Sequence, residues 1–257
     1  MNTPLCIAIV QMPMKWTCKE NTPTILEILV LAAEKGADIC AFPELAITGF
    51  HREIKREADP DKINPALEEI QATCREYNIA TAVGVPTFKG QQIFNSYLFI
   101  NRDGNIIETT EKNGLTEAES TFFQPGTTRT VFEFEGRNLA TVLCREIEDL
   151  DEVTHQIDNQ GLDLILFPSL AGREPEYYQQ SGSRCYEEEA AEMAKNLSTY
   201  VVQINWPHAL NTPESRYLGK SVVISPEGKT LLKLPPNEAG LAIFQLGSAE
   251  YEWFSLG

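Results

Sequence analysis

The sequence predicts an α/β fold in which two mixed sheets are each covered by helices. Short apolar runs, typical of buried strands, alternate along the chain with amphipathic stretches at helical spacing. Hairpin patterns such as Arg102-Asp103-Gly104 interrupt this alternation and indicate antiparallel strands beside parallel ones. No linker, repeat or low-complexity run divides the 257 residues, so we expect one domain over residues 1–257.

The N-terminal part of the chain predicts a strand–helix–strand unit followed by a second helix. The continuous apolar run Leu5–Val10 indicates a buried strand, and Glu20–Lys35 places its apolar side chains at helical spacing. A second apolar run, Asp38–Phe42, predicts the next strand, which completes a right-handed crossover if the two strands are parallel. Polar residues 51–63 predict a loop, and Asn64–Tyr77 predicts an amphipathic helix.

The middle of the chain predicts strands on both sides of one long irregular stretch. Five strands are expected here, at Ile79–Val85, Ile93–Ile100, Asn105–Thr110, Val131–Phe134 and Asn138–Leu143. The dipeptide Glu135-Gly136 supplies the turn between the last two. The stretch Glu111–Thr128 is polar, charged and irregular, which makes it a candidate active-site loop.

The C-terminal part alternates helices with strands. Helices are expected at Leu150–Asn159 and Tyr186–Ser198. Strands are expected at Leu162–Phe167, Tyr200–Asn205, Lys220–Ile224, Thr230–Leu234 and Ala239–Leu246. The turn residues Ser225-Pro226-Glu227-Gly228 join two of them as a hairpin, and we expect Ala239–Leu246 to be the final strand.

Composition excludes several classes of function. The formal net charge of −16 argues against nucleic-acid binding and against an anionic membrane surface, because both favour Lys and Arg. The six cysteines and three histidines are scattered, so neither a disulfide framework nor a metal site is expected. The N-terminus lacks the basic region of a signal peptide, and no apolar run is long enough to span a membrane. A cytoplasmic location is therefore the expectation.

Three chemically useful side chains stand at the ends of predicted strands. Glu44 follows Asp38–Phe42, Lys112 follows Asn105–Thr110, and Cys144 follows Asn138–Leu143. Strand ends are where α/β proteins place their chemistry, and a thiol, a carboxylate and an ammonium could meet there. Each residue alone has a plainer interpretation: Cys144 as a small core side chain, and Glu44 and Lys112 as surface charges.

Longer motifs surround these residues. The run Phe42-Pro43-Glu44-Leu45-Ala46-Ile47-Thr48-Gly49-Phe50 resembles the first signature of the nitrilase superfamily, the carbon–nitrogen hydrolases. Further similarity lies at Ile9–Met12, Ala32–Asp38, Leu143-Cys144 and Lys220–Gly228, and Lys112 lies 144 − 112 = 32 residues before Cys144, close to the spacing of that superfamily. The chain is therefore identified as a member of the amidase-like branch.

The resemblance implies a fold, a site and an assembly. The fold is a four-layer α-β-β-α sandwich, and Glu44, Lys112 and Cys144 match the Glu-Lys-Cys catalytic triad. A second glutamate of the family lies seven residues before the glycine of a Phe-x-Pro-Gly turn, which here is Phe123–Gly126 and makes Glu119 the match. No cofactor or metal is implied. A homodimer or higher homo-oligomer, with contacts through Tyr186–Ser198, is what the family suggests.

The residue types suggest how such a triad would hydrolyse a small carboxamide or ureido compound at a non-peptide C–N bond. Glu44 would take the thiol proton as Cys144 attacks, which gives a thioester acyl-enzyme. Lys112 would lower the pKa of the thiol and stabilise the tetrahedral intermediate. Glu119 would orient Lys112 or the attacking water.

The surroundings of the triad depart from the family pattern. Arg145 and Glu146 replace an aromatic residue and an aspartate after the cysteine. Arg145, Glu146 and Arg173 are our candidates for contact with the substrate: Arg173 as a carboxylate clamp, and Arg145 either facing an anionic group or pairing with a neighbouring glutamate. A nitrile substrate is not favoured, because true nitrilases usually carry tryptophan after the cysteine.

Two other functions remain open at this point. The altered residues around Lys112 and Cys144 would also fit a catalytically weak or inactive binding or regulatory protein on the same scaffold. A thiol redox sensor is the third interpretation, and the sequence offers no adjacent resolving cysteine for it.

Overall fold

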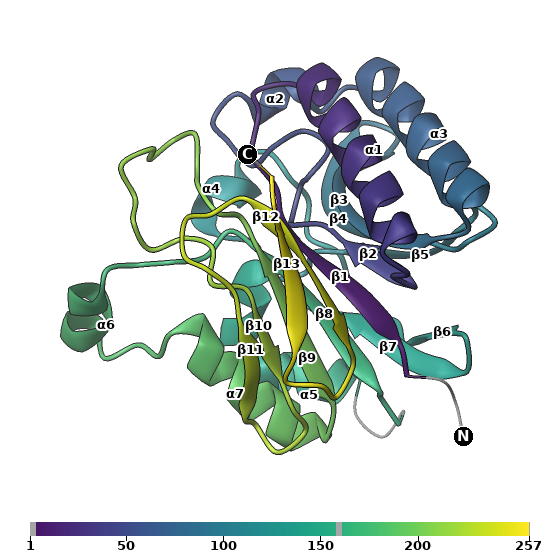
Figure 1. The fold of residues 1–257 in the computed structure, drawn as a ribbon. Helices are drawn as coiled ribbons and strands as arrows, with labels where there is room; N and C mark the ends of the chain where they lie inside the picture. Colours follow the sequence, from purple (N-terminus) through teal and green to yellow (C-terminus); the bar gives the residue numbers. More distant parts are fainter. Residues whose placement is uncertain (1–3, 158–160, 257) are drawn as a thin grey trace.

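Two β-sheets pack face to face with helices on their outer faces in the computed structural model, which describes residues 4–157 and 161–256 (Figure 1). The first sheet has the strand order β13-β12-β1-β2-β3-β4-β5. Its strands are β1 (Cys6–Gln11), β2 (Ile39–Ala41), β3 (Ala80–Lys89), β4 (Gln92–Ile100), β5 (Ile106–Glu111), β12 (Gly240–Gln245) and β13 (Tyr251–Ser255). Only β1, β2 and β3 are parallel to one another, so the sheet is mixed.

The second sheet has the order β11-β10-β9-β8-β7-β6 and repeats the pattern of a parallel centre with antiparallel edges. Its strands are β6 (Phe132–Phe134), β7 (Arg137–Thr141), β8 (Leu164–Ser169), β9 (Tyr200–Asn205), β10 (Val222–Ile224) and β11 (Thr230–Lys233). Strands β7, β8 and β9 are parallel. Polar loops that follow parallel strands leave a sheet at the same edge, and this brings the ends of β7 and β8 together.

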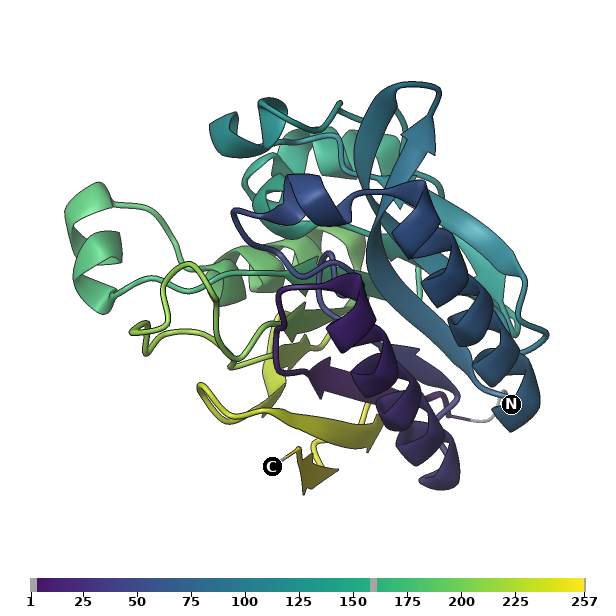
Figure 2. The ribbon, with the colours of Figure 1, turned by 90° about the horizontal axis from the view of Figure 1, so that it is seen from above.

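Four longer helices cover the two outer faces. The helices α1 (Cys18–Glu34) and α3 (Pro60–Tyr77) run side by side over the first sheet (Figure 2). The helices α5 (Leu150–Ile157) and α7 (Tyr186–Leu197) cover the second. The shorter helical segments are α2 (Ile54–Glu57), α4 (Glu117–Ser120), α6 (Pro175–Ser181) and the 3₁₀ turn η1 (Cys144–Glu148).

Three apolar cores separate these layers and confirm the four-layer sandwich. One core lies between α1, α3 and the first sheet, and another lies between α5, α7 and the second sheet. The third fills the space between the sheets with side chains such as Ile7, Phe99, Leu166 and Val202. Alternate residues of each buried strand face opposite cores, which is why the strands are apolar on both faces.

The structure corrects several boundaries predicted from sequence. Residues 51–63, expected as a loop, contain α2 and the start of α3. Asp59 caps α3 by accepting from the Asp61 N–H at 2.9 Å, and Pro60 occupies its first turn, so the expected turn residues form a helix start instead. The expected final strand, β12, is followed by β13, which pairs with it along five residues.

Two short helices, α4 and α6, form where the sequence predicted none. Helix α6 buries none of its side chains and stands away from both sheets (Figures 1 and 2), so it lacks the amphipathic pattern that predicts a helix. Of the helix expected at Leu150–Asn159, the last two residues lie outside the described part.

Within residues 4–157 and 161–256, no helix has the length and apolar character needed to cross a bilayer.

Candidate active site

The loop after β2 presents Glu44 at the gap between the two sheets. The Tyr97 hydroxyl donates to the carbonyl of Phe42 at 2.7 Å, and the Trp206 indole N–H donates to the carbonyl of Glu44 at 2.8 Å. The backbone of this loop also packs directly against Gly84 of β3. A Cβ at Gly84 would lie only 2.1 Å from the backbone nitrogen of Leu45, so only glycine allows the two backbones to approach this closely. The carboxylate of Glu44 is completely buried by this arrangement.

Lys112 follows β5 and places its ammonium between two carboxylates. Its Nζ lies 2.8 Å from Glu44 Oε1 and 2.7 Å from Glu119 Oε1, and the lysine side chain is fully buried. The side-chain amide of Asn95 donates to the same two oxygens, at 2.8 Å and 3.1 Å. One buried cation therefore faces two carboxylates, with an amide N–H₂ as the additional donor.

A capping box at the start of α4 orients Glu119. The Thr116 hydroxyl accepts from the Glu119 N–H at 3.2 Å, while Glu119 Oε2 accepts from the Thr116 N–H at 2.9 Å. This reciprocal pair uses one oxygen of Glu119 and directs the other toward Lys112. The irregular loop predicted at Glu111–Thr128 thus carries one of the groups that surround the ammonium.

Cys144 begins the turn η1 directly after the segment that follows β7. Its φ of +44° lies in the left-handed region, where a residue with a Cβ is strained, and such strain often marks functional positions. The residue is buried, and its Sγ lies 3.9 Å from the carbonyl oxygen of Leu170, which follows β8. The cysteine is therefore at the junction of two parallel strand ends.

Burial and neighbouring charges compete in setting the pKa values of this cluster. Burial raises the pKa of Glu44, and the ammonium of Lys112 offsets only part of that effect. For Lys112, burial lowers the pKa but the charges of Glu44, Cys144 and Glu119 outweigh it, so the pKa is raised. For Glu119, burial raises the pKa, yet Lys112 and Thr116 outweigh it and the pKa is lowered.

The thiol differs from the expectation drawn from sequence. Burial and the negative charge of Glu44 raise the pKa of Cys144, although Lys112 alone would lower it. The thiol is consequently protonated at neutral pH in the free protein. Nucleophilic attack by this sulfur requires a base that removes the proton as the new bond forms.

The second carboxylate oxygen of Glu44 has the properties of such a base. Within the described residues, the buried Oε2 of Glu44 has no hydrogen-bond partner, whereas Oε1 faces both Lys112 and Asn95. A carboxylate with a raised pKa and one open oxygen can both accept and return a proton. Together, thiol, carboxylate and ammonium can perform nucleophilic acyl chemistry.

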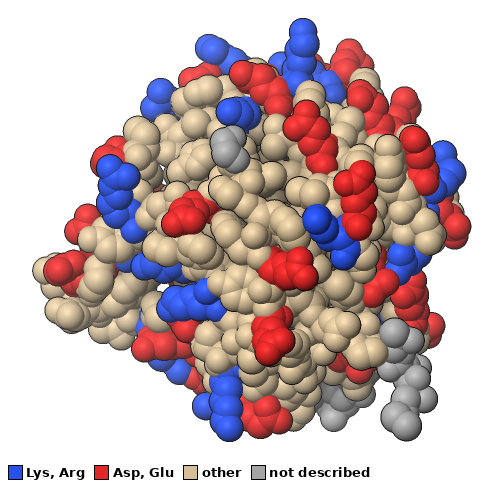
Figure 3. Space-filling model, in the orientation of Figure 1, with Lys and Arg blue, Asp and Glu red and all other residues tan. Residues whose placement is uncertain are grey.

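A cavity of about 860 Å³ opens over Cys144, Lys112 and Glu119. Its outer walls come from the segment around α6 and from the loop before β10. The wall residues include Phe50, Glu117, Arg145, Glu148, Arg173, Tyr177, Tyr178, Arg184, Tyr186, Asn211 and Leu218. Both acidic and basic side chains line the cavity. Figure 3 shows that acidic and basic side chains are also interspersed over one face of the molecule, although the net charge of the chain is −16.

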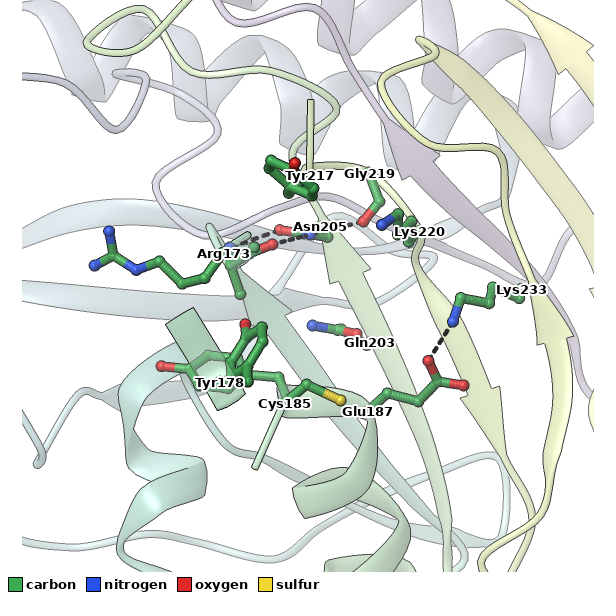
Figure 4. A pocket seen from close by; sticks show the side chains of 13 residues that line it. Arg173, Tyr178, Cys185, Glu187, Gln203, Asn205, Tyr217, Gly219, Lys220 and Lys233 are labelled. Atoms are coloured by element: carbon green, nitrogen blue, oxygen red, sulfur yellow. Dashed lines mark hydrogen bonds and ion pairs between the residues drawn. The ribbon is translucent and has the colours of Figure 1, made fainter. Parts of the chain in front are cut away.

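A smaller cavity of about 140 Å³ adjoins the first and shares Arg173, Tyr178 and Tyr186 with it. Figure 4 shows the ion pair of Lys233 with Glu187 at one end and the side chain of Arg173 pointing away from the others. The Asn205 side chain fixes the shared wall, because it accepts from the Ala171 N–H at 2.9 Å and donates to the Ala171 carbonyl at 2.6 Å.

The two arginines expected to contact a substrate both line the large cavity. The guanidinium of Arg145 is engaged by Asp149, an aspartate rather than the glutamate considered from sequence. The guanidinium of Arg173 lies over the ring of Tyr177, 5.4 Å from its centroid. Arg173 is exposed at the cavity mouth, which leaves its polar edge accessible to an anionic ligand.

Glu146, the third expected substrate contact, is placed elsewhere by the structure. Its side chain is buried, and Oε2 forms an ion pair with Arg129 at 2.6 Å and accepts from the Leu143 N–H at 2.7 Å. Its Oε1 accepts from the Asn113 N–H at 2.6 Å. Glu146 therefore connects the turn of Cys144 to the loop of Lys112 instead of facing the cavity.

Sequence reasoning missed Asn95, Arg129 and Tyr186. A polar pair, Asn95-Ser96, inside an otherwise apolar strand was the available signal for the first. Arg129 and Tyr186 resemble ordinary surface residues in sequence, yet Arg129 is buried against Glu146, and Tyr186 lines the cavity with its hydroxyl 3.2 Å from Glu148.

In the part of the chain that the structure describes, no three His, Cys, Asp or Glu side chains form a group suited to a metal ion.

Comparison with known families and sequences gives consistent matches. The family model described as carbon-nitrogen hydrolase matches residues 6–253. A glutamine-dependent NAD(+) synthetase of Xylella fastidiosa is 26% identical over 159 residues, which cover 58% of this chain and 28% of that protein, so the match spans little more than a quarter of the relative. An aliphatic nitrilase of Rhodococcus rhodochrous is 22% identical and covers 93% of this chain and 74% of that protein.

Solved structures share the fold. An amidase from Nesterenkonia sp. has a TM-score of 0.80 at 21% identity, covering 95% of this chain and 91% of that chain. A mutant of the amidase from Nesterenkonia sp. AN1, with a TM-score of 0.80 and 21% identity over 95% of this chain and 90% of that chain, carries the acetamide moiety of fluoroacetamide covalently added at its active site cysteine.

The buried position of Glu146 leads to a prediction about stability. Glu146→Gln should lower the free energy of unfolding by about 3 kcal/mol, because it leaves Arg129 buried without a carboxylate. Chemical denaturation measures this, with the exposed neighbour Glu148→Gln as the control that changes little. Unchanged stability combined with weaker substrate binding would restore the substrate-contact role expected from sequence.

Proposed function

The chain belongs to the carbon–nitrogen hydrolase family, and from that premise we propose that it cleaves small amides through an acyl-enzyme on Cys144. The observation that carries the proposal is the buried contact of Lys112 with Glu44 and Glu119 beside the thiol, at the base of a cavity. The covalent adduct at the active site cysteine of the Nesterenkonia amidase supports a cysteine nucleophile in the same fold.

Acylation begins at the thiol. The sulfur of Cys144 bonds to the carbonyl carbon of the amide while its proton moves to the open Oε2 of Glu44. The negative charge that develops on the carbonyl oxygen is stabilised by the ammonium of Lys112 and by the backbone N–H of Arg145. The C–N bond then breaks, and Glu44 returns the proton to the departing nitrogen.

Deacylation reuses the same groups. Water attacks the thioester, Glu44 accepts one of its protons, and the C–S bond breaks to release a carboxylic acid. The sulfur recovers its proton from Glu44, so the carboxylate returns to its starting state. Glu119 remains ionised, because its contacts with Lys112 and Thr116 lower its pKa, and its carboxylate holds the ammonium in place.

The cavity lining favours a polar substrate, such as a carboxamide or ureido compound that also carries a carboxylate. Arg173 at the mouth has no carboxylate partner in the described structure, whereas Arg145 and Arg184 are paired with Asp149 and with Glu189. Planar guanidinium groups bind carboxylates through two parallel hydrogen bonds. We therefore assign Arg173 the contact with the acidic end of the substrate.

The proposed function is tested by ammonia release from a panel of small carboxamides and ureido compounds. Wild-type protein should release ammonia and show an acyl mass increment on the peptide that contains Cys144. Cys144→Ala should lower the rate at least about a thousand-fold, since the nucleophile is removed. If wild type stays inactive on a broad panel and Cys144 reacts with iodoacetamide no faster than the other cysteines, a binding protein on this scaffold becomes the better account.

The raised pKa of Glu44 predicts the acid side of the pH profile. Protonated Glu44 cannot accept the thiol proton, so kcat/KM should fall as pH drops through a value above 4.5, the ordinary pKa of a glutamate. The apparent pKa belongs to the coupled cluster rather than to Glu44 alone. Measuring kcat/KM from about pH 4 to pH 8 gives the apparent pKa of the acid limb. An apparent pKa at or below 4.5 would contradict the assignment of Glu44 as base.

Arg173 can be tested separately from the triad. Arg173→Gln should raise KM about ten-fold for an amide that bears a carboxylate and leave KM unchanged for a neutral amide, because one charge-assisted contact is lost. Arg184→Gln is the matched control, since Arg184 also lines the cavity but is already paired with Glu189. If both substitutions raise KM equally, the substrate responds to the total positive charge at the cavity mouth and not to a specific contact with Arg173.

A further inference from the structure

Asn95 is a polar side chain at the centre of an apolar strand. It lies in β4 and is completely buried, as is Ser96 beside it. Its side-chain nitrogen donates to Glu44 Oε1 at 2.8 Å and to Glu119 Oε1 at 3.1 Å, while its backbone carbonyl accepts from the Lys112 N–H at 2.8 Å. One residue therefore contacts all three members of the buried ion cluster.

The orientation of this amide is determined by its neighbours. Two carboxylate oxygens face one end of the side chain, and only the N–H₂ end can be favourable there. The opposite end, Oδ1, is buried and has no hydrogen-bond partner among the described residues. An unsatisfied buried carbonyl costs stability, so the position is better explained by what the N–H₂ group does for the carboxylates.

We propose that Asn95 is a positioning residue that makes Oε2 of Glu44 the proton-accepting oxygen and keeps Glu44 ionised. With Lys112 and Asn95 both bound to Oε1, the carboxylate is fixed in one rotational state and Oε2 stays open. Without the amide, Lys112 would be the one remaining donor among the described residues to the two Oε1 atoms, and two adjacent carboxylates tend to share a proton. This inference rests on the proposed function.

The groups that face Glu44 come from five segments of the chain, and their charges set the direction in which the pKa of Glu44 should move. Lys112 favours the ionised carboxylate, whereas the charge of Glu119, the thiol of Cys144 and the more distant hydroxyl of Tyr186 do not. The hydrogen bond from Asn95 lowers the pKa of Glu44 against the effect of burial. Removing it should therefore raise that pKa and restrict the base form to higher pH.

The experiment compares Asn95→Leu and Asn95→Ala with the control Ser96→Ala. Ser96 is equally buried in the same strand, but its hydroxyl lies 2.6 Å from Thr87 on the opposite face. Both Asn95 variants should lower kcat about ten-fold or more with KM within about two-fold, and should move the acid limb of kcat/KM upward by about one pH unit. Ser96→Ala should leave the limb in place.

A further variant, Glu44→Gln, separates failure of this inference from failure of the proposed function. If wild type releases no ammonia from any amide, the proposed function fails; if wild type is active and Glu44→Gln retains that activity, Glu44 is not the base and the inference about Asn95 is overturned. If Glu44→Gln is inactive while folded Asn95 variants keep the wild-type acid limb, the positioning role of Asn95 alone is overturned. Having two Asn95 variants of different volume, each checked by circular dichroism, keeps the test valid if one of them fails to fold.

Discussion

The buried contact of Lys112 with Glu44 and Glu119 is the interaction on which the rest of the site depends. Removing three charged groups from water costs several kcal/mol for each ion, and the cost is offset only when the geometry and hydrogen bonding are good. Here one ammonium faces two carboxylates at 2.8 Å and 2.7 Å, and Asn95 and Thr116 supply further donors. Such a cluster is stable only while every partner stays in place, which constrains the strands and loops that carry them.

Both sheets contribute to that constraint. Trp206, at the end of β9 in the second sheet, holds the backbone of Glu44, which follows β2 in the first. A second buried ion pair, Glu146 with Arg129, connects the Cys144 turn to the Lys112 loop. The same burial that makes these pairs costly raises the pKa values of the thiol and of Glu44, so a neutral thiol faces a stronger base than an ordinary glutamate.

Most of the fold follows from local patterns in the sequence. Continuous apolar runs located nearly every strand, and helical spacing located α1, α3, α5 and α7, because these elements bury regular faces. The failures occurred where that signal is absent. Helix α6 buries no side chain, and β13 is a partly exposed edge strand that its pairing with β12 stabilises. The start of α3 depends on capping by Asp59, which local composition presented as a turn.

Motifs in the sequence, and their resemblance to those of the carbon–nitrogen hydrolases, were enough to predict Glu44, Lys112, Glu119 and Cys144 as site residues. The folded chain was needed to show how they meet, that Glu146 turns inward to Arg129, and that Asn95 contacts both carboxylates. It also reversed the expected direction for the thiol pKa. The physical reason is that strands and helices arise from neighbours in sequence, whereas burial, charge and hydrogen bonding at this site depend on segments that only folding brings together.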